Sequence, residues 1–297
     1  RDVERSRGLG DVYKRQELRT RGWEVSVKWN DRIGNDFSYD LGFILSDSQA
    51  EITKYENPSG TLSDYYVGQK IGEIWGYETE GFYQSDTDVQ NHADQSKLGA
   101  NWAPGDIMYK DLDGNKKINN GSNTLDDHGD LKVIGNTTPR YQYGITANMS
   151  YKNVYLNVFF QGIGKRDFWP SSQPFWPVAT QYYNTQKWFV TDSWSEDNRD
   201  AYFARPIARE TKNQQKQTKY LQDASYCRLK NLTVGYDFPK SWLSFLHVAK
   251  AGVYFSAENL FEFTNVKGAY DPEAAGKNGT MVYPFQRTYS FGLNVTF

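Results

Sequence analysis

The last nine residues, YSFGLNVTF (Tyr289–Phe297), alternate strictly between two kinds of side chain. Small or polar residues occupy every second position, and bulky apolar residues occupy the others. Two residues is the side-chain period of a β-strand, so the stretch predicts a strand with one apolar face and one polar face. The bulky apolar residues are Tyr289, Phe291, Leu293, Val295 and Phe297.

Six further segments show the same alternation and are predicted to be strands. In GWEVSVKWN, two tryptophans and two valines share one face, opposite Glu24, Ser26 and Lys28. The segment GEIWGYETEGFY, residues 72–83, is either an eighth element or an ordered loop. The six predicted strands lie within residues 22–30, 37–45, 141–151, 154–162, 226–236 and 251–261.

Composition narrows the class of protein. Of the 297 residues, 38% are hydrophobic and 16% aromatic, which suits a β-protein with polar loops or a β-barrel with a wet interior. The net charge of −2 argues against nucleic acid as a partner, because duplex binders normally present a basic face. The single Cys227 excludes an internal disulfide and any multi-cysteine metal site. No apolar run is long enough to predict a membrane-spanning helix.

The connections between the predicted strands alternate in length. Residues 30–36 and 152–153 form short turns and 237–250 a moderate linker, whereas the other connections are long. Short turns on one side and long loops on the other are typical of outer-membrane barrels. The predicted fold is therefore all-β: strands of a large antiparallel transmembrane β-barrel with long extracellular loops. The long connections span about residues 55–139, 162–220 and 263–282.

Strand parity predicts that this chain is the C-terminal part of a longer barrel. If Phe297 ends in the periplasm, counting back through seven strands makes the strand at Trp23 enter from the outside. A complete bacterial barrel has an even number of strands, with both termini in the periplasm. If residues 72–83 also crossed the membrane, the strand count would be even and this argument would fail.

The first sixteen residues do not resemble the rest of the chain. RDVERSRGLGDVYKRQ is charged, has no periodicity and is not a signal peptide. We interpret residues 1–16 as a non-native or disordered leader, and residues 17–297 as the barrel portion.

Several segments resemble the SusC/RagA-type TonB-dependent outer-membrane transporters of Bacteroidetes, and they occur in that family's order. The resemblance concerns the last third of the barrel and implies a location in the cell outer membrane. It further implies import of oligosaccharides or peptides through a barrel of about 22 strands. The partners it implies are a SusD-like surface lipoprotein, the TonB complex, and outer-membrane lipid and assembly machinery. The segments are GDIMYKDLDGNKKIN (105–119), VIGNTTPRYQYGI (133–145), VFFQGIGKRD (158–167), YCRLKNLTVGYDFP (226–239), NLFEFTNVKGAYDPE (259–273) and YPFQRTYSFGLNVTF (283–297).

One segment carries a possible metal site. In DLDGNKKIN, the oxygen-bearing residues Asp111, Asp113 and Asn115 alternate as at the start of an EF-hand calcium loop. The sixth position, where such loops carry glycine, is Lys116, and the twelfth is Ser122 instead of glutamate. A structural calcium ion and an Asx-rich turn without metal are both open, and no other cofactor is expected.

The most aromatic stretch lies in a long loop. Its tryptophans, Trp169, Trp176, Trp188 and Trp194, are candidates for stacking on sugar rings of a substrate. The alternatives are packing within the loop, contact with a partner protein, or an aromatic girdle at the membrane surface.

The terminal strand has a second predicted role. Its five alternating apolar residues, ending in Phe297, are similar to the C-terminal signal that the outer-membrane assembly machinery reads.

No enzyme is predicted. His92, His128 and His247 are isolated, and the carboxylate pairs Asp192/Glu196 and Asp271/Glu273 have spacings common in any acidic loop. The alternatives are a soluble β-sandwich carbohydrate-binding module and a barrel-embedded enzyme.

Overall fold

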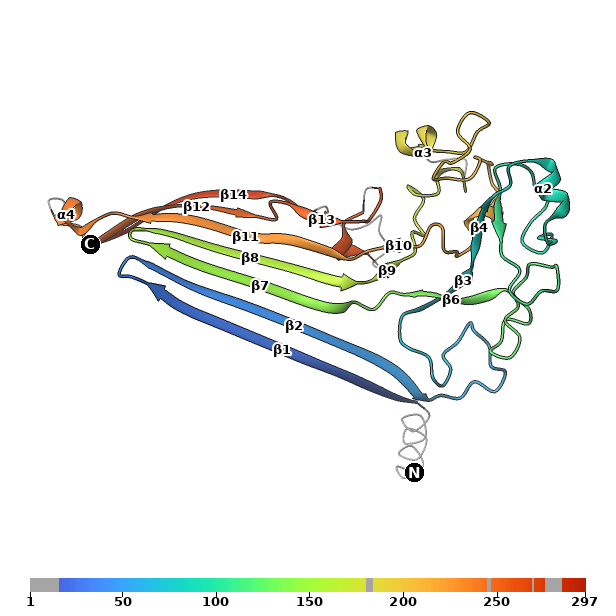
Figure 1. The fold of residues 1–297 in the computed structure, drawn as a ribbon, viewed down its shortest axis with the longest axis horizontal. Coiled ribbons are helices and arrows are strands. Elements are labelled where there is room, and N and C mark those ends of the chain that lie inside the picture. The colour runs from blue at the N-terminus through green and yellow to red at the C-terminus, as the bar shows by residue number, and fades with distance from the viewer. Residues whose placement is uncertain (1–15, 180–183, 245–246, 269, 276–284) are drawn as a thin grey trace, which may run out of the picture.

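Seven long strands form one antiparallel sheet in the order β1-β2-β7-β8-β11-β12-β14 (Figure 1). The computed structural model describes residues 16–179, 184–244, 247–268, 270–275 and 285–297, so the predicted leader lies outside the described residues except for Gln16. All seven predicted strands are present, and the unclosed antiparallel sheet confirms the all-β fold class. They are β1 (Glu17–Ile33), β2 (Phe37–Lys54), β7 (Arg140–Tyr151), β8 (Val154–Lys165), β11 (Tyr226–Asp237), β12 (Lys250–Glu258) and β14 (Thr288–Thr296).

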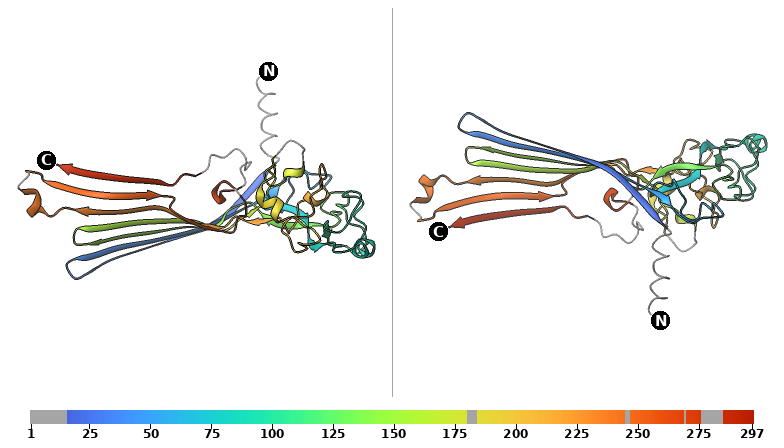
Figure 2. Two further views of the ribbon diagram at one scale, coloured as in Figure 1. Left: turned by 90° about the horizontal axis from the view of Figure 1, so that it is seen from above. Right: turned by 90° about the horizontal axis from the view of Figure 1, so that it is seen from below.

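The two ends of the sheet differ. The turns β1–β2 and β7–β8 and the moderate β11–β12 linker lie at one end, together with the C-terminus (Figure 1). The described parts of the long connections lie at the opposite end, where β1 begins. Figure 2 shows the strands twisting across the sheet and the long connections extending beyond that end only. The predicted alternation of short and long connections is therefore confirmed.

The pairing register gives the sheet one continuous apolar face. Side chains from the seven strands fall into rows, and apolar residues meet apolar residues in most of them, with Trp23 opposite Asp47 and Tyr39 opposite Asp31 as exceptions. Phe291 and Leu293 keep 83% and 65% of their surface exposed, although both are large and apolar. One such row consists of Trp29, Leu41, Ala147, Val158, Leu232, Ala257 and Tyr289.

A soluble β-sandwich would bury this apolar face against a second sheet. Within the described residues, the other sheets are three small two-stranded ones, β9–β10, β3–β6 and β4–β5. They lie at the long-connection end and do not cover the apolar face (Figures 1 and 2). The sandwich alternative is therefore not favoured.

A β-bulge keeps β11 in phase with its neighbours. Leu229 pairs with Phe160 and Asn231 with Phe159, so Lys230 is an extra residue in β11. An extra residue reverses which positions face each side. Arg228 therefore belongs to the polar face, while Leu232, three pairs further along, belongs to the apolar face.

The predicted strand at residues 251–261 is shorter than expected. β12 ends at Glu258, and Asn259 adopts a left-handed conformation with φ of 51°. Asparagine tolerates this conformation better than most residues. A separate short strand, β13 (Glu262–Thr264), then pairs with the first residues of β11.

The two longest connections are ordered. We call residues 55–139 and 166–225 the loop domain. Residues 72–83 belong to it as β3 and β4, and do not join the main sheet. The described helices are short, and none is long and apolar enough to span a membrane. The other elements among the described residues are β3 (Glu73–Tyr77), β4 (Thr79–Phe82), α2 (Asp86–Asn91), β5 (Ile107–Tyr109), β6 (Leu131–Asn136), β9 (Asp167–Phe168), η1 (Pro177–Ala179), α3 (Lys187–Thr191), η2 (Lys212–Gln214), β10 (Gln222–Asp223), α4 (Lys240–Leu243) and η4 (Pro272–Ala274).

On the polar face, tyrosine rings cover glycines of the next strand. Tyr155 pairs with Gly235, and Tyr254 pairs with Gly292. A Cβ at Gly235 would lie 2.1 Å from the ring of Tyr155, and one at Gly292 would lie 2.2 Å from the ring of Tyr254. Each ring therefore occupies the space that the missing side chain leaves free.

We predict that Gly235→Ala and Gly292→Ala each lower the free energy of unfolding by about 1–3 kcal/mol, because the tyrosine ring must move off the neighbouring strand. Gly144→Ala is the matched control, since its Cβ would meet the nearest ring atom, on Phe159, at 3.4 Å. Urea unfolding of the whole protein in detergent measures the difference. Equal losses in all three variants would contradict the packing role.

Candidate functional site

The polar face of the sheet carries a row of hydrogen-bonding side chains across all seven strands. Asn148 donates to Asp40 at 3.2 Å, and the hydroxyls of Thr233 and Ser256 lie 2.9 Å apart. One row closer to the short-turn end, the hydroxyls of Ser38 and Ser150 lie 2.7 Å apart. Such a face can exchange hydrogen bonds with water or with a hydrated solute. The row is Asn30, Asp40, Asn148, Asn157, Thr233, Ser256 and Ser290.

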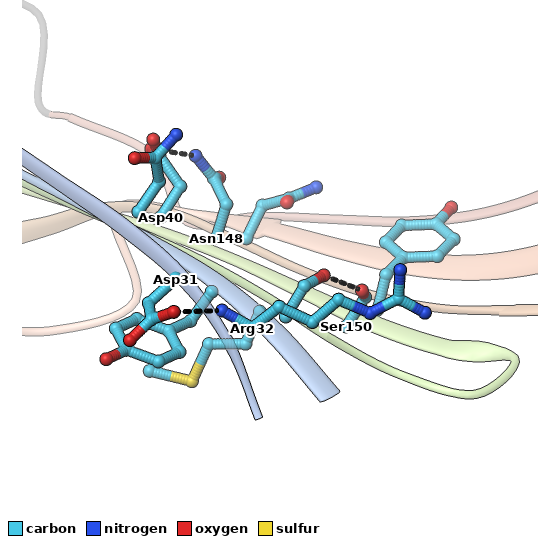
Figure 3. Close-up of a pocket in the computed structure, with 11 residues that line it drawn as sticks. Asp31, Arg32, Asp40, Asn148 and Ser150 are labelled. Atoms are coloured by element: carbon cyan, nitrogen blue, oxygen red, sulfur yellow. Dashed lines mark hydrogen bonds between the residues drawn. The ribbon is translucent and has the colours of Figure 1, made fainter. Parts of the chain in front are cut away.

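A pocket of about 610 Å³ lies over part of this face, near the turn between β1 and β2 (Figure 3). The labelled residues come from three strands: Asp31 and Arg32 from β1, Asp40 from β2, and Asn148 and Ser150 from β7. On this face, Arg32, Asp40, Asn148 and Ser150 donate and accept hydrogen bonds and carry both signs of charge, whereas the register places the side chain of Asp31 on the other face. They suit a wet surface along which a polar solute passes.

The hydrophobic core of the described residues lies in the loop domain, away from the main sheet. Tyr83, Tyr109, Tyr220, Phe175 and Phe203 are its largest fully buried side chains. Their rings meet mostly edge to face, as aromatic pairs prefer. Aromatic residues thus supply the apolar surface that makes these long connections fold.

The four predicted substrate-contacting tryptophans all belong to this core or pack against it. Trp176 and Trp194 expose only 9% and 8% of their surface, and the Trp176 indole N–H donates to a backbone carbonyl at 2.6 Å. Trp169 and Trp188 are half-buried, and Trp188 stacks on Tyr202. Their packing is evident, and contact with a substrate stays a prediction.

A buried carboxylate joins the two halves of the loop domain. Asp106 is fully buried and accepts two hydrogen bonds from Arg205, at 2.8 and 2.9 Å. Asn213 donates to it at 2.9 Å, and the ammonium group of Lys212 lies 3.0 Å away. That ammonium also lies 4.8 Å from the centre of the Trp102 ring. Sequence reasoning missed this group, because its members lie about a hundred residues apart.

Two opposing effects set the pKa of Asp106. Burial raises the pKa of this carboxyl, and the hydrogen bonds from Arg205, Asn213 and Lys212 lower it. The hydrogen bonds prevail, so the pKa lies below its ordinary value of 3.8. Asp106 is therefore ionised at neutral pH and holds two cations in the interior of the loop domain.

A second buried charge joins β11 to the last long connection. Arg228 is almost fully buried and donates to Glu262 at 2.8 Å, to Asp271 at 2.7 Å and to Glu273 at 2.6 Å. Lys230 adds a further hydrogen bond to Glu273. The pair Asp271/Glu273 is thus engaged in ion pairs and holds the connection against the sheet.

The Asp-rich loop brings two of the predicted ligands together with a third carboxylate. Asp111 accepts backbone N–H groups of Gly114 and Lys116, both at 2.8 Å, as in an Asx-rich turn. Carboxylate oxygens of Asp111, Asp113 and Asp130 lie within 4.8 Å of one another, and the side-chain amide of Asn115 donates to Asp113 at 2.7 Å. Asp130 is fully buried and its position far along the chain gave no signal. Calcium binding stays a prediction.

The terminal strand β14 lies at an edge of the sheet. It pairs with β12 on one side, and its other edge has no partner within the described residues. Phe255 on β12 packs against Tyr289 and Phe291, so these residues share the apolar face as predicted. Phe297 follows the strand and is 91% exposed. Its role as an assembly signal stays a prediction.

Comparison with known proteins agrees with the motifs. No protein-family model matches the chain. TonB-dependent receptor P3 of Formosa agariphila is 29% identical over 95% of this chain, and TonB-dependent receptor SusC of Bacteroides thetaiotaomicron is 24% identical over 94% of it. The chain spans only 29% and 26% of the lengths of these two relatives.

Solved structures share the fold. The RagAB peptide transporter matches with a TM-score of 0.67 and 22% identity, covering 95% of this chain and 30% of that one. The RagAB peptide importer in its 'open-open' state gives the same TM-score. The sheet therefore has the fold of part of a β-barrel wall, and the resemblance to SusC/RagA-type TonB-dependent transporters is confirmed.

The buried Asp106 makes the stability of the loop domain depend on pH. Because the folded pKa lies below that of the unfolded chain, the stabilisation is complete above about pH 4 and is lost as the pH falls through the folded pKa. We predict that Asp106→Asn costs about 3–5 kcal/mol at pH 7, because Arg205 and Lys212 lose their buried partner. The substitution should also make the free energy of unfolding depend less on pH in the acid range. Unfolding followed by tryptophan fluorescence measures both effects.

Glu78→Gln is the control for this experiment. Glu78 pairs with Lys110 and Lys132 at a partly exposed position, so its loss should cost under about 1 kcal/mol. An Asp106→Asn variant as stable as the Glu78→Gln variant would show that the buried cluster does not hold the loop domain together.

Proposed function

We propose that this chain forms part of the wall and the outside loops of a TonB-dependent nutrient importer in the cell outer membrane. One observation supports this most: seven neighbouring strands present an apolar face on one side and a polar face on the other. Lipid would cover the apolar face, and the polar face would line the interior. The strands have 9 to 18 residues, and about 9–11 suffice to cross a bilayer.

The edges of the sheet are consistent with a larger wall. Within the described residues, β1 and β14 each have one unpaired edge. Unpaired backbone groups are very unfavourable in lipid, so strands from outside this chain would pair with both edges. The curated relatives, of which this chain spans less than a third, are long enough to supply such strands.

The loop domain would face the cell exterior, since it lies opposite the short turns. In the proposed complex it would contact a SusD-like surface lipoprotein, and the TonB complex would supply energy through other parts of the protein. The substrate would be an oligosaccharide or a peptide. The receptor names of the curated relatives and the peptide-transporter title of RagAB support an import role.

Translocation requires no chemical step from this chain. Three of the loop carboxylates that sequence analysis considered as acid–base groups have other partners: Asp271 and Glu273 bind Arg228, and Asp192 accepts the backbone N–H of Tyr202. The residues of the polar face would instead offer hydrogen bonds to a passing solute and exchange them readily with water.

Two neighbouring substitutions test the orientation of the wall. Leu156 lies on the apolar face and Asn157 on the polar face of β8. We predict that Leu156→Arg reduces the amount of protein in the outer membrane, because a cation facing lipid costs up to about 2–4 kcal/mol, depending on its depth in the bilayer. Asn157→Arg should leave the amount nearly unchanged. Membrane fractionation of the whole protein measures both.

A whole protein found in the soluble fraction would refute the proposed location. Equal amounts of the Leu156→Arg and Asn157→Arg variants in the membrane fraction would refute the assignment of the two faces. An arginine that faces lipid should be tolerated less well than one that faces the lumen.

The carboxyl terminus provides a separate prediction. Deletion of Phe297 from the whole protein should lower its level in the outer membrane, because the proposed assembly signal ends at this residue. Phe297→Tyr keeps an aromatic terminus and should assemble normally. Normal levels of the deletion variant would show that Phe297 is not part of an assembly signal.

A further inference from the structure

A second pocket, of about 540 Å³, lies in the loop domain and shares no lining residue with the pocket on the polar face. It brings together segments from both halves of the loop domain. Two indole rings, two lysines and several side-chain amides line it. The residues that matter below are Trp75, Lys97, Asn120, Trp169, Gln215 and Lys216.

One wall of this pocket is held firmly. The backbone carbonyl of Lys216 accepts the N–H of Tyr77 at 2.8 Å. A Cβ at Gly76 would lie 2.5 Å from that carbonyl oxygen, so only glycine permits this approach. The next residue, Gln217, is fully buried, and its amide donates to the hydroxyl of Tyr109 at 3.2 Å. The backbone of Lys216 is therefore held in place by these contacts.

Both indole rings are also fixed and remain partly exposed. The Trp75 N–H donates to the hydroxyl of Tyr66 at 3.0 Å, and its ring packs against His128. The ring of Trp169 lies 6.0 Å from that of Trp176, which is part of the core. Rigid, half-buried indoles with apolar faces suit flat apolar surfaces such as the C–H face of a sugar ring.

The pocket has an unbalanced positive charge. Lys97 and Lys216 are exposed, and neither ammonium group has an ion pair or hydrogen bond within the described residues. By contrast, Lys110 and Lys132 both pair with Glu78 in the same domain. No carboxylate is among the described residues that line the pocket. Such a pocket attracts anions.

The amides complete the set of ligand contacts. The side chain of Asn120 has no hydrogen bond within the described residues, and that of Gln215 uses only its N–H group. Amides can both donate to and accept from hydroxyl groups. The pocket thus combines fixed apolar ring surfaces with cations and amides that are available to a ligand.

We propose that this pocket binds an acidic oligosaccharide. Sugar rings would stack on Trp75 and Trp169, carboxylate or sulfate groups would pair with Lys97 and Lys216, and hydroxyls would bind the amides. This inference rests on the proposed import function and names the class of substrate. An acidic peptide is the competing ligand, and tetraglutamate is the probe for it below.

Calorimetry on the whole protein in detergent tests the proposal. The probes are tetragalacturonate, a sulfated carrageenan tetrasaccharide and neutral galactotetraose. At least one acidic probe should bind about tenfold more tightly than the neutral one, because a charge-assisted hydrogen bond contributes about this much. The affinity should fall as salt is added. The two acidic probes, one carrying carboxylates and one carrying sulfates, show which anion the pocket prefers.

Variants locate the site. Lys97→Gln combined with Lys216→Gln should weaken acidic binding about tenfold or more and leave neutral binding unchanged. Lys187→Gln, an exposed lysine of the loop domain outside the pocket, is the matched control and should change affinity less than about twofold. Trp169→Ala should weaken the binding of all three sugar probes. If Trp169→Ala does not fold, the lysine variants alone decide, because they lie on the surface.

Equal affinity for acidic and neutral probes, no binding of any probe, or tighter binding of tetraglutamate than of both acidic sugars would overturn the proposal. An unchanged affinity in the double lysine variant would overturn it as well. None of these outcomes touches the proposed import function, which depends on the location of the protein and on Leu156 and Asn157.

Discussion

The two-residue period of the strands, combined with a strict pairing register, is the constraint on which this structure depends. A slip of one residue in any pair would send the apolar set of that strand to the polar face. The bulge at Lys230 shows how the register is maintained. It allows Arg228 to reach the carboxylates of the last connection on the polar side, while Leu232 still joins the apolar row.

Apolar surface in this protein is divided between two environments. The main sheet leaves its large apolar side chains exposed on one face, whereas the loop domain encloses an aromatic core. The loop domain also encloses charges, and a buried ion pair contributes little unless its hydrogen bonds are complete. Asp106 meets that condition, with partners from Arg205, Lys212 and Asn213. The long connections are therefore specific structures that can present a pocket at fixed positions.

Sequence reasoning succeeded for the sheet and was incomplete for the loops. Alternation is visible within a few neighbouring residues, so each strand could be recognised separately. The end of β12 was misplaced because a single Asn259 in a left-handed conformation interrupts an otherwise regular pattern. In the loop domain, the aromatic residues were recognised as a group, but nothing in their spacing showed that Trp176 would be buried and Trp169 half-exposed.

The sequence by itself determined the seven strands, the face to which most of their side chains belong, and the end at which the long connections lie, because these depend on local period and on chain length. The tertiary structure decided which distant groups meet. Asp106 and Arg205 are 99 residues apart along the chain, and Asp130 reaches the acidic loop from beyond its end. Lys97 and Lys216 likewise share a pocket only because the two longest connections pack against each other. Such meetings follow from the path of the folded loops, which no local pattern in the sequence encodes.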